Sequence, residues 1–141
     1  MPQKRLPPDD PREWLNRARH NLARAQQPLV TDYLEDFCFD AQQAAEKAIK
    51  AVFIARGLRF PYTHDLDRLL GLLSKAGIRV PKYVEQSDWL TPFAAEARYP
   101  GISGPVTKPQ QRRAVRLATA VLNWAARQVK GWHPPPGQGG P

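Results

Sequence analysis

The stretch from Leu34 to Gly57 constrains the fold more than any other part of the sequence. It reads LEDFCFDAQQAAEKAIKAVFIARG. Its apolar residues recur at intervals of three and four, which is the period of an α-helix and not of a strand. They are Leu34, Phe37, Cys38, Ala41, Ala44, Ala45, Ala48, Ile49, Val52 and Phe53. Because Phe39 and Ile54 lie off this stripe, more than one face is apolar, and we expect this helix at the centre of a bundle.

Small residues suit this predicted helix to close packing. Several of its apolar positions are alanines. Alanine adds little bulk, so a neighbouring helix axis can approach near the short end of the usual range of about 8–10 Å. Gly57 follows the last turn and can adopt a positive φ angle, which would end the helix there.

Four further helices are expected around the central one. Apolar spacing, capping residues and prolines place them near residues 10–27, 64–76, 89–99 and 107–130, with an irregular or one-turn segment at 78–88. The expected N-caps are Asp10, Thr63, Thr91 and Thr107. Strand-type alternation recurs nowhere, and short connections make sequential helices antiparallel neighbours. The sequence therefore predicts an all-α antiparallel bundle of about five helices.

The length of 141 residues indicates one domain. We expect a flexible leader at residues 1–9, the helical bundle at 10–130 and a disordered tail rich in Pro and Gly at 131–141. No apolar run approaches the roughly 18 residues that span a membrane, and the N-terminus lacks the apolar segment of a signal peptide. We therefore expect a cytoplasmic protein without a membrane partner.

Several kinds of chemistry are excluded by the residues present. Cys38 is the one cysteine, which rules out a disulfide framework and a cysteine metal site, and we expect it to be a small buried residue. The histidines His20, His64 and His133 are far apart and lack metal-ligand spacing. The sequence also lacks G-x-S-x-G and a glycine-rich phosphate loop. We expect no metal and no cofactor.

The net charge is +8, with 21 Lys and Arg residues against 13 Asp and Glu. Such an excess suits a polyanionic partner, nucleic acid above all. The alternative is that the excess reflects amino-acid composition alone and forms a basic face that contacts only solvent. Basic residues gather on the first and last predicted helices, at Arg12, Arg17, Arg19, His20 and Arg24, and at Lys108, Arg112, Arg113, Arg116, Arg127 and Lys130. We expect any nucleic-acid binding by them to be mainly electrostatic and to weaken with salt.

One group of candidate site residues lies on the central helix. Gln42 and Glu46 are four residues apart and share a face, and so do Gln43 and Lys47. Their polar side chains suit contact with a ligand or a partner. The alternative is a solvated helix surface with modest pair stabilisation of about 0.2–0.5 kcal/mol per pair.

Two further candidates lie at predicted helix ends. The segment 62–65 contains His64 and Asp65, and its alternative role is a capped helix start, where Asp65 suits the helix dipole. Arg98 and Tyr99 precede a loop at the other end of a predicted helix. Arginine matches phosphate bidentately and a tyrosine ring can stack a base. Packing and a helix C-cap are the alternatives for this pair.

The segments CFDAQQAAEKAIKA, FPYTHDLDRLL and EARYPG, in this order and spacing, resemble the HEPN domain family. The resemblance covers roughly Trp14 to Val129 and is strongest to stand-alone bacterial and archaeal members. One departure is Asp40, where many relatives have histidine. The resemblance implies four or five helices, frequent homodimers and an association with nucleotides or RNA. It also implies a minimal nucleotidyltransferase as a partner, in a pair similar to a toxin and its antitoxin.

Some members of this family are metal-independent ribonucleases with an R-x4-6-H motif, in which arginine stabilises phosphate charge and histidine moves protons. Arg59 and His64 match this motif by spacing and are the weak catalytic candidates. In the nucleases, however, the motif lies late in the domain. Arg98 and Tyr99 are therefore the better candidates for a site, one that contacts a ligand or partner without catalysis.

The leading interpretation is a HEPN binding module that is not catalytic on its own and acts with a nucleotidyltransferase partner. A metal-independent ribonuclease toxin and a purely structural dimerisation domain are the alternatives. The residues expected to contact a ligand or partner are Arg98, Tyr99, Gln42, Glu46, Lys47, His64 and Asp65.

Overall fold

A computed structural model describes residues 4–28, 33–96 and 105–136 of the chain. Its elements are α1 (Pro11–Ala25), α2 (Leu34–Ala55), α3 (Leu66–Lys75), α4 (Lys82–Glu85), the 3-10 helix η1 (Gln86–Leu90), α5 (Phe93–Glu96) and α6 (Lys108–Val129). The described residues contain no strand, which confirms the prediction of an all-α fold. The short helices α4, η1 and α5 follow one another between α3 and α6.

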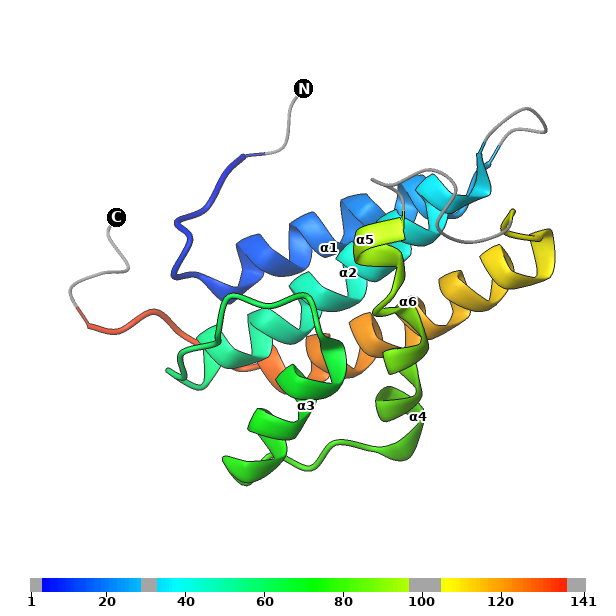
Figure 1. Cartoon of the computed structure of the whole chain (residues 1–141). Coiled ribbons are helices and arrows are strands. Elements are labelled where there is room, and N and C mark those ends of the chain that lie inside the picture. The colour runs from blue at the N-terminus through cyan, green and yellow to red at the C-terminus, as the bar shows by residue number, and fades with distance from the viewer. Residues whose placement is uncertain (1–3, 29–32, 97–104, 137–141) are drawn as a thin grey trace.

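Helix α2 is the centre of the bundle. It packs most extensively against α1 and α6, which run alongside it, and the shorter helices pack around these three (Figure 1). The alanines of α2 explain the closeness of this packing, because Ala41, Ala44, Ala45, Ala48 and Ala51 are all fully buried. The core is completed by large side chains, including Ile49 and Phe53 of α2 and Leu66, Leu69 and Leu73 of α3.

Side-chain caps define where the helices begin. Asp10 accepts a hydrogen bond from the backbone N–H of Arg12 at the start of α1, and Thr107 forms a capping box with Gln110 at the start of α6. Both caps were predicted. At the C-terminus of α2, Gly57 has a φ angle of 67°, as expected for a glycine that ends a helix.

The predicted cap Thr63 is wrong for α3. Asp65 is the cap, and its carboxylate accepts the backbone N–H of Arg68. The hydroxyl of Thr63 accepts the N–H of Asp65 and so supports the turn before the cap. The chain before Asp65 is not helical, which places Thr63 too early to reach the first free N–H groups of the helix.

The predicted helix at 89–99 begins later than expected. Trp89 lies in η1, and α5 starts only at Phe93. Pro92 stands between them, and a proline lacks the N–H that would continue the preceding helix. Thr91 does not cap α5 in the predicted way: its hydroxyl accepts the N–H of Leu66 and so connects this segment to the start of α3. The expected one-turn segment before it is α4.

Described parts of both terminal segments contact α1. The N–H of Leu6 donates to Glu13, and the indole N–H of Trp14 donates to the carbonyl of Pro8. From the other terminus, the ring of Trp132 lies 5.6 Å from the guanidinium of Arg12. The flexibility expected of residues 1–9 and 131–141 stays a prediction. Within the described ranges, no helix has both the length and the apolar character that a membrane span requires.

We predict that Ala48→Leu lowers the free energy of unfolding by about 1–3 kcal/mol, because a larger side chain at this fully buried position cannot be accommodated without displacing a neighbouring helix. Ala23→Leu, on the exposed side of α1, is the control and should change stability by less than about 0.5 kcal/mol. Urea unfolding of both variants measures the difference. Equal stability of the two variants would show that the packing around α2 is loose.

A basic cleft between α1 and α2 as candidate functional site

A cavity of about 510 Å³ lies between the N-terminal segment, α1 and α2, and we call it the basic cleft. Its lining residues are Arg5, Glu13, Asn16, Arg17, His20, Asn21, Arg24 and Lys47. Six of these come from α1, where they recur at intervals of three, four and seven and therefore share one face of the helix. Lys47 faces them from α2. No single sequence motif marks this cleft, because three separate segments of the chain meet to form it.

The cleft has an excess of positive charge. Among the described residues that line it, four are arginine or lysine and Glu13 is the one carboxylate. Glu13 accepts hydrogen bonds from the N–H of Leu6 and from Nε of Arg17, at 2.9 and 2.6 Å, and these bonds hold the pKa of its carboxyl below the ordinary value. The side chain of Arg17 nevertheless remains 56% exposed, so its guanidinium can still bind a second anion.

Lys47 is a half-buried charge in the cleft that has no carboxylate partner among the described residues. Its ammonium group donates a hydrogen bond of 2.7 Å to the amide oxygen of Asn21. No carboxylate among the described residues lies within 4 Å of it. Burial, followed by the positive charge of Arg17, lowers the pKa of Lys47 from its ordinary value of 10.5. A charge in this environment would be stabilised by a bound anion.

Asp40 orients the polar groups beneath the cleft. It is buried, and its carboxylate accepts a hydrogen bond of 3.0 Å from the amide nitrogen of Asn21. This bond directs the amide oxygen of Asn21 towards Lys47. Arg24 lies 3.5 Å from the other carboxylate oxygen of Asp40, a longer contact that leaves the arginine side chain 64% exposed. Asp40 is therefore a support of the cleft.

A second polar cluster, the Glu46 cluster, lies on the same helix. Glu46 is buried and takes part in three hydrogen bonds: from Lys50 at 2.9 Å, from Gln42 at 3.1 Å and between its Oε1 and Nδ1 of His64 at 2.7 Å. Gln42 also donates to the backbone carbonyl of His64. Burial raises the pKa of Glu46, but the three bonds outweigh it and hold the pKa below its ordinary value of 4.5. The cluster connects α2 to the segment before α3.

The predicted site residues lie in different environments. Gln42 and Glu46 are buried, so the alternative of a solvated surface is wrong for them. Lys47 lines the basic cleft, and Asp65 is the exposed N-cap of α3. Gln43 donates to the side-chain oxygen of Gln42.

The remaining predicted residues lie elsewhere. Arg59 is exposed, and among the described residues no hydrogen bond or ion pair joins it to His64. Arg98 and Tyr99 lie outside the described residues. Arg5 and Asn21 were not predicted to take part in a site. Arg17 and Arg24 were predicted as part of a basic face of the first helix, but their place in one cavity with Lys47 was not predicted.

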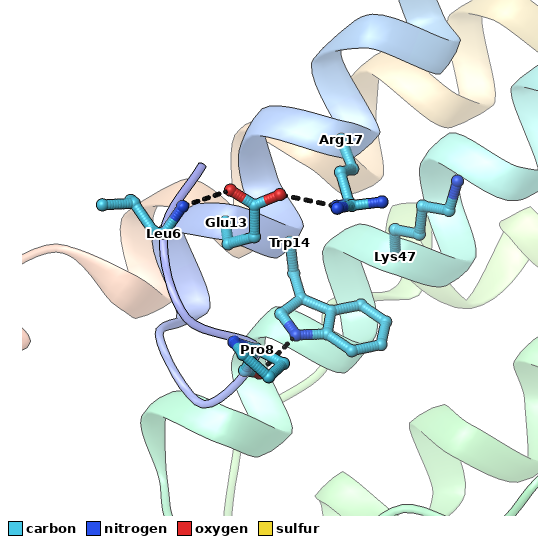
Figure 2. A pocket seen from close by; sticks show the side chains of 6 residues that line it. All are labelled: Leu6, Pro8, Glu13, Trp14, Arg17 and Lys47. Atoms are coloured by element: carbon cyan, nitrogen blue, oxygen red, sulfur yellow. Dashed lines mark hydrogen bonds and ion pairs between the residues drawn. The ribbon is translucent and has the colours of Figure 1, made fainter. Parts of the chain in front are cut away.

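An apolar pocket of about 420 Å³ adjoins the basic cleft, and we call it the Trp14 pocket. It is lined by Leu6, Pro8, Glu13, Trp14, Arg17 and Lys47 (Figure 2). Glu13, Arg17 and Lys47 line both cavities. The described residues include no group of three or more His, Cys, Asp or Glu that would hold a metal ion.

Comparison with known proteins identifies the family. The model of the HEPN domain matches residues 11–129, and the chain belongs to this family. The crystal structure of TT1696 from Thermus thermophilus is similar, with 30% identity, a TM-score of 0.72 and coverage of 85% of this chain and 98% of that one. That of ST0689, an archaeal HEPN homologue, has 26% identity, a TM-score of 0.69 and coverage of 91% and 100%. No curated protein matches the chain.

We predict that Glu46→Gln lowers the free energy of unfolding at pH 7 by about 3–5 kcal/mol, because Lys50 would stay buried without its carboxylate partner. Folding lowers the pKa of Glu46, so the stabilisation from its carboxylate is complete above pH 4.5, the ordinary pKa of the group. This stabilisation is lost as the pH falls through the folded-state pKa. The difference between wild type and variant should therefore shrink in acid. Exposed Glu85→Gln is the control, and urea titrations between about pH 7 and pH 3 provide the measurement. A difference that does not change with pH would contradict the assignment.

Proposed function

We propose that this HEPN-domain protein is a binding module for the phosphate groups of a nucleotide or RNA, and that the basic cleft is its binding site. The observation that carries the proposal is Lys47, a half-buried ammonium group whose partner among the described residues is an amide oxygen and not a carboxylate. Arg17 and Arg24 add two largely exposed guanidinium groups to the same cavity.

The side chains in the cleft suit phosphate in particular. A guanidinium is a planar group of donors that matches two phosphate oxygens, and a lysine ammonium adds a compact charge. The volume of about 510 Å³ is within the range of small-ligand sites. A carboxylate ligand would use the same charges, but the excess of cations over Glu13 favours a ligand with more than one negative charge.

The protein acts, in this proposal, together with a nucleotidyltransferase in a pair similar to a toxin and its antitoxin, as the family resemblance implies. The homodimer expected from the sequence belongs to the same proposal. The sequence argument for the homodimer was that a central helix apolar on more than one face needs a second copy to cover it, with Trp89, Phe93 or Trp124 in the contact. The apolar residues of α2 from Ala41 to Phe53 are, however, buried within the protomer, and so are Phe93 and Trp124. Trp89, half-buried beneath the guanidinium of Arg113, is the remaining aromatic candidate for a dimer contact.

The ribonuclease alternative has less support. Arg59 and His64 satisfy the spacing of the motif, but Arg59 is exposed and the imidazole of His64 is engaged by the buried carboxylate of Glu46. The structural alternative does not account for a lysine that is half-buried without a carboxylate among the described residues. Phosphate binding accounts for it directly.

We predict that Arg24→Ala and Lys47→Gln each weaken binding of a fluorescent single-stranded RNA of about ten nucleotides by about tenfold or more, because a hydrogen bond to a charged group contributes about 1.5–3 kcal/mol. Each variant should also reduce the dependence of the affinity on salt. Arg116→Ala, at an exposed arginine on α6, removes the same charge outside the cleft and should weaken binding less than about twofold. Fluorescence anisotropy at two salt concentrations measures all three.

Equal losses in Arg116→Ala and the cleft variants would mean that binding depends on net charge alone. In that case the basic cleft is not the site. Mass measurement of the native complex purified from its own cells tests the partner: a nucleotidyltransferase bound to the chain supports the pair, and a homodimer or monomer without it contradicts this part of the proposal.

A further inference from the structure

The basic cleft and the Trp14 pocket share three lining residues, and all three are charged. Arg17 and Lys47 line both cavities, together with Glu13. In Figure 2, Arg17 and Lys47 lie towards one end of the Trp14 pocket and Pro8 lies towards the other, beside the Trp14 ring, whereas the side chain of Leu6 points away from that ring. A ligand in these cavities therefore meets cationic groups at one end and apolar groups at the other.

Trp14 is held in position by two contacts. Its indole N–H donates a hydrogen bond of 2.8 Å to the carbonyl of Pro8. Its ring also packs edge-on against Phe60, with the ring centroids 5.6 Å apart and an angle of 74° between the planes. Because the ring is oriented before any ligand arrives, it loses little freedom when a flat group packs against it.

We propose, on the basis of the proposed function, that the two cavities form one site for a nucleoside 5′-monophosphate. The phosphate binds Arg17 and Lys47, and the base packs against Trp14 beside Pro8. Flat heteroaromatic bases stack well on aromatic side chains, whereas the sugar-phosphate backbone alone offers nothing to the apolar end. The arrangement thus selects a ligand with a phosphate and a base close together.

The N-terminal segment is part of this site. Leu6 and Pro8 line the Trp14 pocket, and Arg5 lines the basic cleft. The segment is attached to α1 by the bonds from Leu6 to Glu13 and from Trp14 to Pro8. Its loss would remove the apolar end and leave Arg17, Arg24 and Lys47 in place.

Isothermal titration with AMP, GMP, CMP, UMP and ribose 5-phosphate tests the proposal. At least one nucleoside monophosphate should bind the intact chain about fivefold or more tightly than ribose 5-phosphate, which has the phosphate without the base. Trp14→Leu should abolish this preference and change the affinity for ribose 5-phosphate less than about twofold. Trp89→Leu is the matched control, since Trp89 is also half-buried but lines neither cavity, and it should keep the preference.

A second variant guards against misfolding of Trp14→Leu. Because residues 4–8 contribute no side chain to the buried core, deletion of residues 1–8 should preserve the fold and remove the same preference. Equal affinities of the intact chain for nucleoside monophosphates and ribose 5-phosphate would overturn the base site but leave phosphate binding in the cleft standing. Binding of RNA without any of the monophosphates would also overturn it, in favour of a polymer ligand. Failure of RNA and all small ligands to bind would refute both proposals.

Discussion

The close packing of α2 against α1 and α6 is the constraint on which the rest of the structure depends. The fully buried alanines allow it, and it places the polar residues of α2 next to other helices instead of water. Asp40, Glu46 and Lys50 are buried as a result, and Lys47 is half-buried. Burial of a charge without a partner is costly, so each of these residues needs a compensating group, either on α2 itself or on a neighbouring segment.

Some of these charged side chains have partners of opposite charge and Lys47 does not, and this difference locates the candidate site. Glu46 is surrounded by Lys50, His64 and Gln42, and this set of partners makes the cluster a structural link between α2 and the start of α3. Lys47, one residue further along, has the neutral oxygen of Asn21 where Glu46 has two basic groups. Two adjacent residues of one helix thus differ in role because their side chains face different neighbours.

Much of the fold could be predicted from the sequence, since the period of α2, the caps Asp10 and Thr107 and the absence of strand patterns are local signals. The cap of α3 could not be predicted, because both Thr63 and Asp65 are suitable capping residues. The late start of α5 could not be predicted either, because the hydroxyl of Thr91 bonds to Leu66, which is distant in the sequence. For the site, Lys47 was predicted from its helix face. Its association with Arg17, Arg24 and the leader arises only when separate segments meet, which no local pattern encodes.

The carboxylate of Glu13 lies in the basic cleft but does not cancel the positive charge of the cleft. One of its oxygens accepts the N–H of Leu6, and the other accepts Nε of Arg17, so its charge is shared between the leader and one edge of a guanidinium. The side chain of Arg17 is still 56% exposed, which leaves its other edge open to a ligand. With Arg24 and Lys47 in the same cavity, the balance remains positive. Glu13 therefore orients Arg17 and attaches the N-terminal segment, and a phosphate can approach the cations from the open side.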